Sequence, residues 1–343
     1  MLRRNFGLVL CLLSPSQAAP LGSGCEVVPS ALASPESVGL KPGPVAALVQ
    51  AARDADSNGF AVLKDGKLIA GFGEKRPVMS YSVTKAIVGM AAGRLFTEGK
   101  WTQLDAPLGT LLPEFAGDPK GEVTLRQLMS HTSGIRDARD AAGHVLKAWN
   151  EEKDWIQAAR RQPMQEPPGT VFRYNNQGPA LVAAAVERAS GARLDRFLER
   201  TLFEPLCIGG TRWNTDSAGH AAGYTGLSIS ALNLAKLGQL ILNCGQWGST
   251  QVLSEDWVRQ SALTSSQPVA KGVGLFWFLD WEPKFPLPVV VYHSGDGGQY
   301  LMIFPNHGIV VARLRNSGYA SGKQAMGNLG QLIANHLIKE QRP

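Results

Sequence analysis

The stretch PVMSYSVTKAIVGM at residues 77–90 holds a Ser-x-x-Lys pair, Ser82 and Lys85, at the start of a long apolar run. The run predicts a helix, and on a helix residues i and i+3 lie on one face about one turn apart. The lysine amine can then reach the serine hydroxyl, while the helix N-terminus offers N–H groups and positive potential to a developing anion. An activated serine nucleophile needs this geometry. The pair alone is weak evidence, because about one Ser-x-x-Lys is expected by chance.

The composition is that of a globular protein with a full core. The chain has 343 residues, of which 44% are hydrophobic and 18% charged. At this length we expect one large domain with an insertion, or two closely packed domains. The net charge is +6, but the basic residues are scattered along the chain. A nucleic-acid partner is therefore not expected.

Residues 1–19 have the layout of a secretory signal peptide. Arg3 and Arg4 precede the apolar run 6–13, and small residues at 16–19 offer a cleavage site. The apolar run is too short to span a bilayer permanently, and no second long one follows. We expect an exported protein, periplasmic or secreted, without stable membrane insertion.

Three cysteines follow this leader: Cys25, Cys207 and Cys244. An oxidising compartment allows one disulfide among them, and the sequence does not decide which two pair. The leucine before Cys25 lies one place too far upstream for a good lipid-attachment signal, so a lipid anchor is a lesser alternative. The cysteines are too far apart for a zinc knuckle, the histidines are dispersed and no His-Glu-x-x-His occurs. We expect no metal and no cofactor.

Strand patterns occur towards both ends of the chain, and mostly helical patterns lie between them. A hairpin is predicted around Asp65-Gly66, and a second hairpin turn at 305–308. The last segment, 323–339, predicts an amphipathic helix. One antiparallel sheet built from both ends, with an inserted helical domain, accounts for this order. The predicted parts are a leader (1–19), a linker (20–42), an α/β domain (43–95 and 266–343) and a helical domain (96–265).

Two further motifs follow Ser82. A Tyr-x-Asn at 174–176 comes after a turn signal and before a predicted helix, and a His-x-Gly at 293–295 ends a predicted strand. Ser-x-x-Lys, Tyr-x-Asn and Lys/His-x-Gly, in this order, resemble the serine β-lactamase and penicillin-binding protein superfamily. The most similar groups look like class C β-lactamases, D-Ala-D-Ala carboxypeptidases, family VIII esterases and 6-aminohexanoate-dimer hydrolases.

The resemblance covers about residues 40–338, because the segments 128–135 and 228–248 also look like segments of this superfamily. It implies an α+β fold of the β-lactamase/transpeptidase type, with an antiparallel sheet flanked by the N- and C-terminal helices and an inserted, mostly helical domain. It also places His131 in a structural turn, so His131 is not expected to be catalytic. The chain lacks Gly-x-Ser-x-Gly, which disfavours an α/β-hydrolase.

The resemblance further implies roles for individual residues. Ser82 would attack a carbonyl and form an acyl-enzyme. Lys85 and Tyr174 are both candidates for the general base, and the sequence does not choose between them. Asn176 would hydrogen-bond a substrate amide or Lys85. The oxyanion hole would consist of the backbone N–H groups of Ser82 and Asp296.

The third motif, with His293 and Gly295 before Asp296, would bind substrate. Many relatives have lysine where this chain has His293, and a lysine charge helps to hold a substrate carboxylate. A histidine is mostly neutral at neutral pH, so its hydrogen bond to a carboxylate is weaker. This favours a hydrolase of small esters or amides: an esterase, a D-amino-acid amidase or an amide-oligomer hydrolase. The aromatic run 276–278 could line an acyl pocket, although alternate residues of a strand face opposite ways.

Several alternatives remain open. A D-Ala-D-Ala carboxypeptidase acting on peptidoglycan-type peptides, or a β-lactamase, would use the same residues. A non-catalytic peptidoglycan- or penicillin-binding module would keep the fold without the chemistry. Acyl transfer to an acceptor other than water is not distinguished from hydrolysis. We expect the protein to be a monomer.

Overall fold

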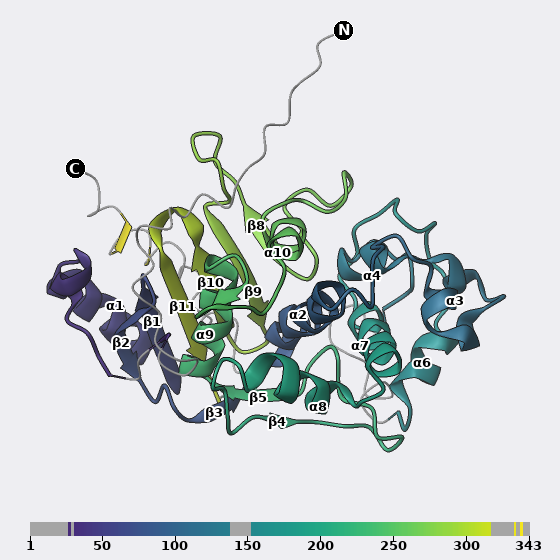
Figure 1. The fold of residues 1–343 in the computed structure, drawn as a ribbon, viewed down its shortest axis with the longest axis horizontal. Coiled ribbons are helices and arrows are strands. Elements are labelled where there is room, and N and C mark those ends of the chain that lie inside the picture. The colour runs from purple at the N-terminus through teal and green to yellow at the C-terminus, as the bar shows by residue number, and fades with distance from the viewer. Residues whose placement is uncertain (1–26, 29–30, 138–151, 317–332, 334–336, 339–343) are drawn as a thin grey trace, which may run out of the picture.

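A six-stranded antiparallel sheet forms one half of the molecule, and most of the helices form the other (Figure 1). The computed structural model describes residues 27–28, 31–137, 152–316, 333 and 337–338. The sheet order is β2-β1-β11-β10-β9-β8, so strands from the two ends of the chain meet at its centre. The strands are β1 (Gly59–Lys64), β2 (Lys67–Phe72), β8 (Phe278–Asp280), β9 (Val290–Gly295), β10 (Gln299–Phe304) and β11 (Ile309–Leu314). The predicted sheet built from both ends is confirmed.

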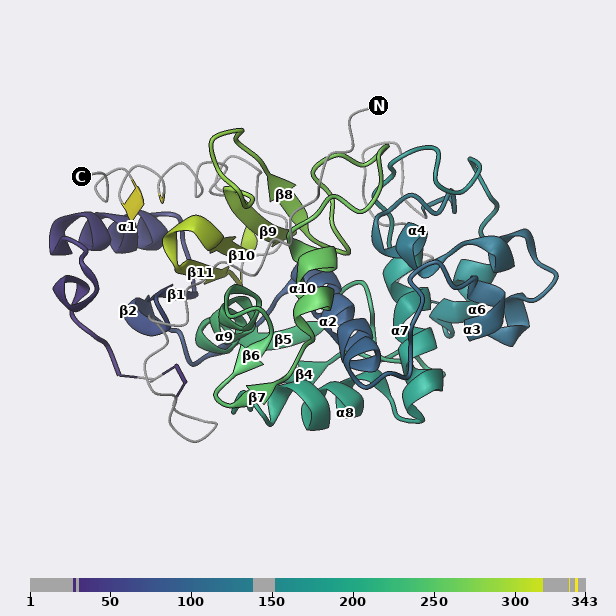
Figure 2. The same ribbon diagram turned by 45° about the horizontal axis from the view of Figure 1, so that its top comes forward.

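The two faces of this sheet are covered by different helices. Successive side chains of a strand point to opposite faces. Phe60 and Val62 accordingly pack into a cluster with α1 (Pro42–Asp54), whereas Ala61 and Leu63 belong to the main core of the molecule. On this second face α9 (Ala231–Leu242) packs against β1, β10 and β11 (Figure 2).

Helix α2 (Thr84–Thr97) is the central helix of the fold. It is buried on all sides from Thr84 to Gly93, which explains why its sequence is apolar without a polar face. It packs against α7 and α10, and Figure 1 shows it between the sheet and the helical half. The other helices are α3 (Leu108–Leu111), α4 (Leu125–Met129), α6 (Trp155–Arg161), α7 (Gln177–Ser190), α8 (Leu194–Leu198) and α10 (Glu255–Ala262).

A small second sheet, which the sequence did not indicate, leads into α2. Its order is β3 (Pro77–Met79), β5 (Leu227–Ser230) and β4 (Arg212–Trp213). Ser80, just after β3, bonds the Leu227 carbonyl through both its backbone N–H (2.8 Å) and its hydroxyl (2.9 Å). This contact fixes the chain entering α2 to the segment before α9. A further two-stranded hairpin joins β6 (Gln246–Trp247) to β7 (Thr250–Gln251).

Both predicted hairpins are present. The strands β1 and β2 pair on either side of Asp65-Gly66, and β10 and β11 pair on either side of a 3₁₀ turn at Pro305–His307. The aromatic run 276–278 lies mostly outside a regular strand, because β8 begins only at Phe278. Phe276 has φ = 60°, a left-handed conformation that a regular strand excludes.

Some sequence predictions concern residues outside the described ranges. The leader, Cys25 and most of the 323–339 helix are among them, although Ile333 and Leu337 pack into the cluster beside α1. Cys207 and Cys244 are both disulfide-bonded. No helix of the described ranges combines the length and the hydrophobicity that a bilayer crossing requires. The domain boundaries stay a prediction.

Candidate active site

The first motif lies where the chain turns from β3 into α2. Tyr81 has φ = 45°, a costly conformation for a bulky side chain and one that concentrates at functional sites. A short 3₁₀ turn (Tyr81–Val83) then carries Ser82 directly into the first turn of the helix. The predicted spacing of one helical turn places the Lys85 Nζ atom 3.1 Å from the Ser82 Oγ atom.

Lys85 is held in place by a second contact that the sequence did not reveal. Its side chain is fully buried, and Nζ also donates a hydrogen bond to the Tyr224 carbonyl at 2.8 Å. Tyr224 lies three residues before β5, on the segment tied to Ser80. No side-chain motif marks a backbone carbonyl as a partner, so sequence reasoning could not have found it. The amine is therefore positioned between one hydroxyl and one carbonyl.

Tyr174 of the second motif lies beneath this amine. The Lys85 Nζ atom is 4.9 Å from the centroid of the Tyr174 ring, a cation–π distance. His131 supports the ring from another side, with 4.6 Å between ring centroids, and its Nδ1 accepts the Asn175 N–H at 3.4 Å. His131 thus braces the Tyr174 segment, which agrees with the expectation that it is structural.

Asn176 stands at the start of α7, and it is buried. Its backbone N–H donates to Asp137 Oδ1 at 3.0 Å. The preceding residue, Asn175, has the more evident structural role, because its Oδ1 accepts the Gly178 N–H at 2.8 Å within the first turn of the helix. The predicted role of the Asn176 amide towards substrate stays a prediction.

The third motif meets the first by direct backbone contact. A Cβ atom on Gly295, at the end of β9, would lie 2.6 Å from the Ser80 carbonyl oxygen and 3.0 Å from the Ser82 nitrogen. Only glycine allows the strand to approach the serine so closely. The next residue in the chain is Asp296, whose N–H was the second predicted oxyanion donor. The close approach explains why the motif needs glycine at this position.

His293 is a buried, neutral histidine. Its Nδ1 lies 2.8 Å from the Ser294 carbonyl oxygen, and since a carbonyl only accepts, Nδ1 must carry the proton. Burial, followed by the nearby Lys85 charge, lowers the pKa of His293 to about 3. The remaining nitrogen, Nε2, is then a hydrogen-bond acceptor, and it is buried without a partner among the described residues.

Aromatic rings complete this side of the site. Phe278 on β8 lies 5.3 Å from His293 and 6.4 Å from Tyr174, centroid to centroid, and is half-buried. Trp277 is buried in the main core instead. The three motifs therefore lie together: Ser82 contacts Lys85 and Gly295, the Lys85 amine covers Tyr174, and Tyr174 is 6.5 Å from His293 between ring centroids.

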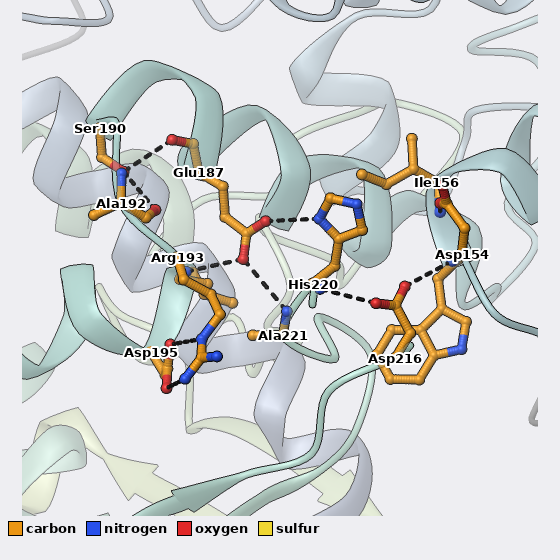
Figure 3. A network of polar contacts seen from close by, with 12 residues as sticks. Asp154, Ile156, Glu187, Ser190, Ala192, Arg193, Asp195, Asp216, His220 and Ala221 are labelled. Carbon is orange, nitrogen blue, oxygen red and sulfur yellow. Dashed lines mark hydrogen bonds and ion pairs between the residues drawn. The ribbon is translucent and has the colours of Figure 1, made fainter. Parts of the chain in front are cut away.

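A separate polar cluster in the helical half has donors that could hold a cation (Figure 3). Asp154, Asp216 and His220 each place one ligand atom within 4.8 Å of the others. The hydrogen bonds of the two carboxylates are structural. Asp154 caps α6, and Asp216 accepts the backbone N–H groups of Trp155 and His220. His220 Nδ1 lies 3.0 Å from Glu187 Oε2 of α7, and its hydrogen bond to this carboxylate raises the pKa of His220 against the effect of burial. The cluster thus joins α6, α7 and the loop between Asp216 and His220.

A cavity of about 570 Å³ lies at the other end of α2. Its lining includes Phe96, Gly99 and Trp257. Since α2 rises 1.5 Å per residue, this cavity is about 20 Å from Ser82. It is separate from the three motifs.

The fold and the site define a β-lactamase/transpeptidase-like protein. A model of the beta-lactamase family matches residues 45–335, so the chain belongs to the beta-lactamase family, whose members are typically serine hydrolases. The predicted superfamily and fold are confirmed.

Known proteins of this kind are similar to the chain at low identity. The "Putative D-alanyl-D-alanine carboxypeptidase" of Escherichia coli K12 is 24% identical over a 290-residue alignment, and the match covers 67% of this chain and 66% of that protein. The chain spans just under two thirds of the length of the first curated relatives it matches, 62% to 66%.

Two solved structures share the fold over most of the chain. The "Putative 6-aminohexanoate-dimer hydrolase from Bacillus anthracis" has a TM-score of 0.74 and 21% identity, covering 95% of this chain and 91% of that one. EstCE1, described as a hydrolase with promiscuous acyltransferase activity, has a TM-score of 0.70 and 16% identity, covering 88% and 99%.

Proposed function

We propose that this protein is an exported serine hydrolase that forms an acyl-enzyme on Ser82 and cleaves small esters or amides. The observation that carries the proposal is the 3.1 Å contact between the Ser82 hydroxyl and the buried Lys85 amine, at a point where Gly295 also reaches the Ser82 backbone. A nucleophile, a base and an electrophilic backbone then lie within one small volume, as acyl transfer requires.

The proposed reaction has two halves. In the first, Ser82 Oγ attacks the substrate carbonyl and gives its proton to the base, and the resulting oxyanion is stabilised by the N–H groups of Ser82 and Asp296. Collapse of this intermediate breaks the ester or amide bond, and the leaving alcohol or amine takes the proton. In the second half, water attacks the acyl group by the same route and releases the acid. One well-placed oxyanion donor contributes about 3 kcal/mol of transition-state stabilisation.

Lys85 is favoured as the first proton acceptor. It contacts the Ser82 hydroxyl directly, so in its neutral form the amine can take the hydroxyl proton, and its second hydrogen bond, to the Tyr224 carbonyl, holds it there. Tyr174 lies under the amine and would pass the proton on to the leaving group. The sequence left open whether Lys85 or Tyr174 is the base. In this proposal Lys85 accepts the Ser82 proton and Tyr174 delivers it to the leaving group.

His293 supports substrates that do not depend on a carboxylate. With its proton on Nδ1 and its pKa at about 3, it supplies no cation at the position where many relatives have lysine. A carboxylate facing Nε2 would meet a lone pair, whereas an amide N–H or a hydroxyl would meet a partner. The half-buried Phe278 beside it suits an apolar acyl or alcohol group.

The export part of the proposal rests on the leader pattern at residues 1–19 alone. N-terminal sequencing of protein recovered from the periplasm or the medium tests it. A mature chain that begins near residue 20 supports export. A chain that retains Arg3 and Arg4 and stays in the cytoplasm would contradict it.

A substrate panel on wild type and Ser82→Ala tests the enzymatic part. The panel contains p-nitrophenyl acetate and butyrate, nitrocefin, a D-Ala-D-Ala peptide and a linear amide dimer. We expect clear hydrolysis of the short esters, feeble nitrocefin turnover and loss of both in Ser82→Ala. Ser261→Ala, at a buried serine of α10, is the matched control and should keep wild-type rates.

Two outcomes would redirect the proposal. Nitrocefin turnover far faster than ester hydrolysis would show that His293 does not weaken carboxylate binding. Ester hydrolysis that persists in Ser82→Ala would remove the acyl-enzyme itself. His293→Lys adds a direct test of specificity, because it should shift the relative rates towards substrates that carry a carboxylate.

A further inference from the structure

The turn between β9 and β10 carries the proposed second oxyanion donor, Asp296. Gly295 ends β9 and pairs with Gln299, the first residue of β10, and the turn lies between them. Two of its residues, Gly297 and Gly298, have φ values of 78° and 90°. Glycines lose more conformational freedom on folding than any other residue, so such a turn is loose unless neighbouring groups hold it.

Gln299 holds the first part of the turn. Its side chain is fully buried, and Nε2 donates to the Asp296 carbonyl at 3.2 Å and to the Arg315 carbonyl at 2.9 Å. Its Oε1 accepts the Arg315 N–H at 2.7 Å. Both ends of the amide are therefore engaged, which allows it only one orientation. The Asp296 carbonyl is tied through this amide to the end of β11.

Arg313 holds the other end of the turn. It is buried on β11, and Nη1 donates to the Gly298 carbonyl at 2.9 Å. Its other nitrogens bond the Ala55 carbonyl at 2.6 Å and the Ser57 hydroxyl at 2.7 Å, just beyond α1. Burial lowers the pKa of Arg313 to about 10, so it keeps its charge at neutral pH. A charged guanidinium makes stronger hydrogen bonds than a neutral donor.

Gln299 and Arg313 thus hold the carbonyls of Asp296 and Gly298, in the turn whose Asp296 N–H the proposed reaction uses. We propose that Gln299 and Arg313 are positioning residues of the oxyanion hole, which fix the turn so that the Asp296 N–H points at the oxyanion formed on Ser82. This inference rests on the proposed function, because it assigns a purpose to groups behind that site. Neither side chain is placed to touch the substrate; each acts through the backbone of the turn.

The test compares two buried glutamines. Gln299→Met removes the three hydrogen bonds at similar volume, and Gln239→Met makes the same change on α9, where Gln239 is also buried but bonds only Asn243 among the contacts seen. Active sites are counted by fluorophosphonate titration, and kcat and KM for p-nitrophenyl acetate are expressed per titrated site. We expect Gln299→Met to lose at least about tenfold in kcat with KM within about twofold, since an oxyanion donor acts on the transition state.

A purely structural role predicts something different. It would lower the melting temperature and the number of titratable sites while leaving kcat per site at the Gln239→Met value, and that result would overturn the proposal. Gln299→Glu, which keeps the acceptor for Arg315 but loses both donations, gives a second measurement if the methionine variant does not fold. It too should lose kcat; an unchanged kcat would count against the proposal.

The proposed function and the positioning role of Gln299 and Arg313 can fail separately. If wild type neither labels at Ser82 nor hydrolyses any ester, the proposed function fails, and the positioning role fails with it. If wild type and Gln239→Met are active while Gln299→Met keeps full kcat per site, only the positioning role is wrong.

Discussion

Two buried lysines, Lys85 on α2 and Lys236 on α9, are alike in their burial and differ in what their amines contact. Lys85 is 0% exposed and Lys236 is 7% exposed, each on a helix that is buried over most of its length. Lys236 donates to two backbone carbonyls, those of Leu206 at 3.2 Å and Cys207 at 2.9 Å. Lys85 donates to one carbonyl, and its other acceptor is the Ser82 hydroxyl.

The difference shows that a buried amine is not by itself evidence of catalysis. Burial lowers the pKa of Lys236, yet its two acceptors carry no proton that it could take. The two carbonyls lie just beyond the helical turn Glu199–Phe203, and one of them belongs to the disulfide-bonded Cys207. Lys85 has a hydroxyl, a phenol ring and the start of a helix around it. Chemistry depends on this combination, and burial only strengthens the electrostatic effects within it.

The largest effect on kcat should come from Lys85→Met, and Lys236→Met is the comparison. Lys85→Met removes the proposed base and should lower kcat for p-nitrophenyl acetate by about a thousandfold, within the range of general base catalysis. Lys236→Met leaves two carbonyls without their donor and should change kcat by no more than about twofold, with its cost visible in the melting temperature instead. Steady-state kinetics and thermal unfolding of both variants measure this. Similar losses of kcat in the two variants would contradict a catalytic Lys85 and a structural Lys236.

Tyr174→Phe tests whether the hydroxyl of the phenol next to Lys85 contributes to the reaction. We expect a loss of about a hundredfold in kcat, because the variant lacks the hydroxyl proposed to pass a proton to the leaving group but retains the ring under Lys85. Tyr292→Phe on β9 is the matched control, because that tyrosine is half-buried and packs on Phe278 without lying under the amine. Its kcat should stay near wild type. Equal rates for Tyr174→Phe and wild type would leave Lys85 as the sole proton carrier.

The smallest effect concerns the contact between His220 and Glu187. His220 lies four residues before Tyr224, whose carbonyl accepts a hydrogen bond from Lys85. The Glu187 hydrogen bond raises the pKa of His220 above its ordinary value of 6.5. A raised pKa in the folded state means that the stabilisation is complete below pH 6.5 and is lost as the pH rises through the higher value. Urea unfolding should therefore show wild type losing stability relative to His220→Gln as the pH rises above 6.5. Parallel pH curves for the two proteins would show that the ion pair contributes nothing.

The parts of this molecule that the sequence predicted are the local ones. Ser82 and Lys85 meet because a helix fixes the geometry of residues three apart, and the turn at Asp65-Gly66 has its own chemistry. Strand patterns towards both ends of the chain indicated one sheet built from both ends. The order of the three motifs, read through the family resemblance, indicated the β-lactamase/transpeptidase type of fold. The contacts of His131 with the Asn175 N–H and the Tyr174 ring agree with the structural role expected of it.

The parts that the sequence did not predict depend on contacts between distant backbone groups. The Tyr224 carbonyl behind Lys85 has no residue type that marks it, and the approach of Gly295 to Ser82 involves segments more than 200 residues apart. The supports of the turn at Asp296 reach β11 and the end of α1. The small sheet of β3, β5 and β4 consists of strands of two to four residues, too short for a periodic pattern.

The most direct test of the account is covalent labelling of Ser82. Folded protein is treated with a fluorophosphonate, digested and examined by mass spectrometry, with Lys85→Met and Lys236→Met treated in parallel. We predict one adduct, on Ser82, formed at similar rates in wild type and Lys236→Met and far more slowly in Lys85→Met. An unlabelled Ser82 in folded wild type, or labelling at equal rates in all three proteins, would contradict the claim that Lys85 activates Ser82 as a nucleophile.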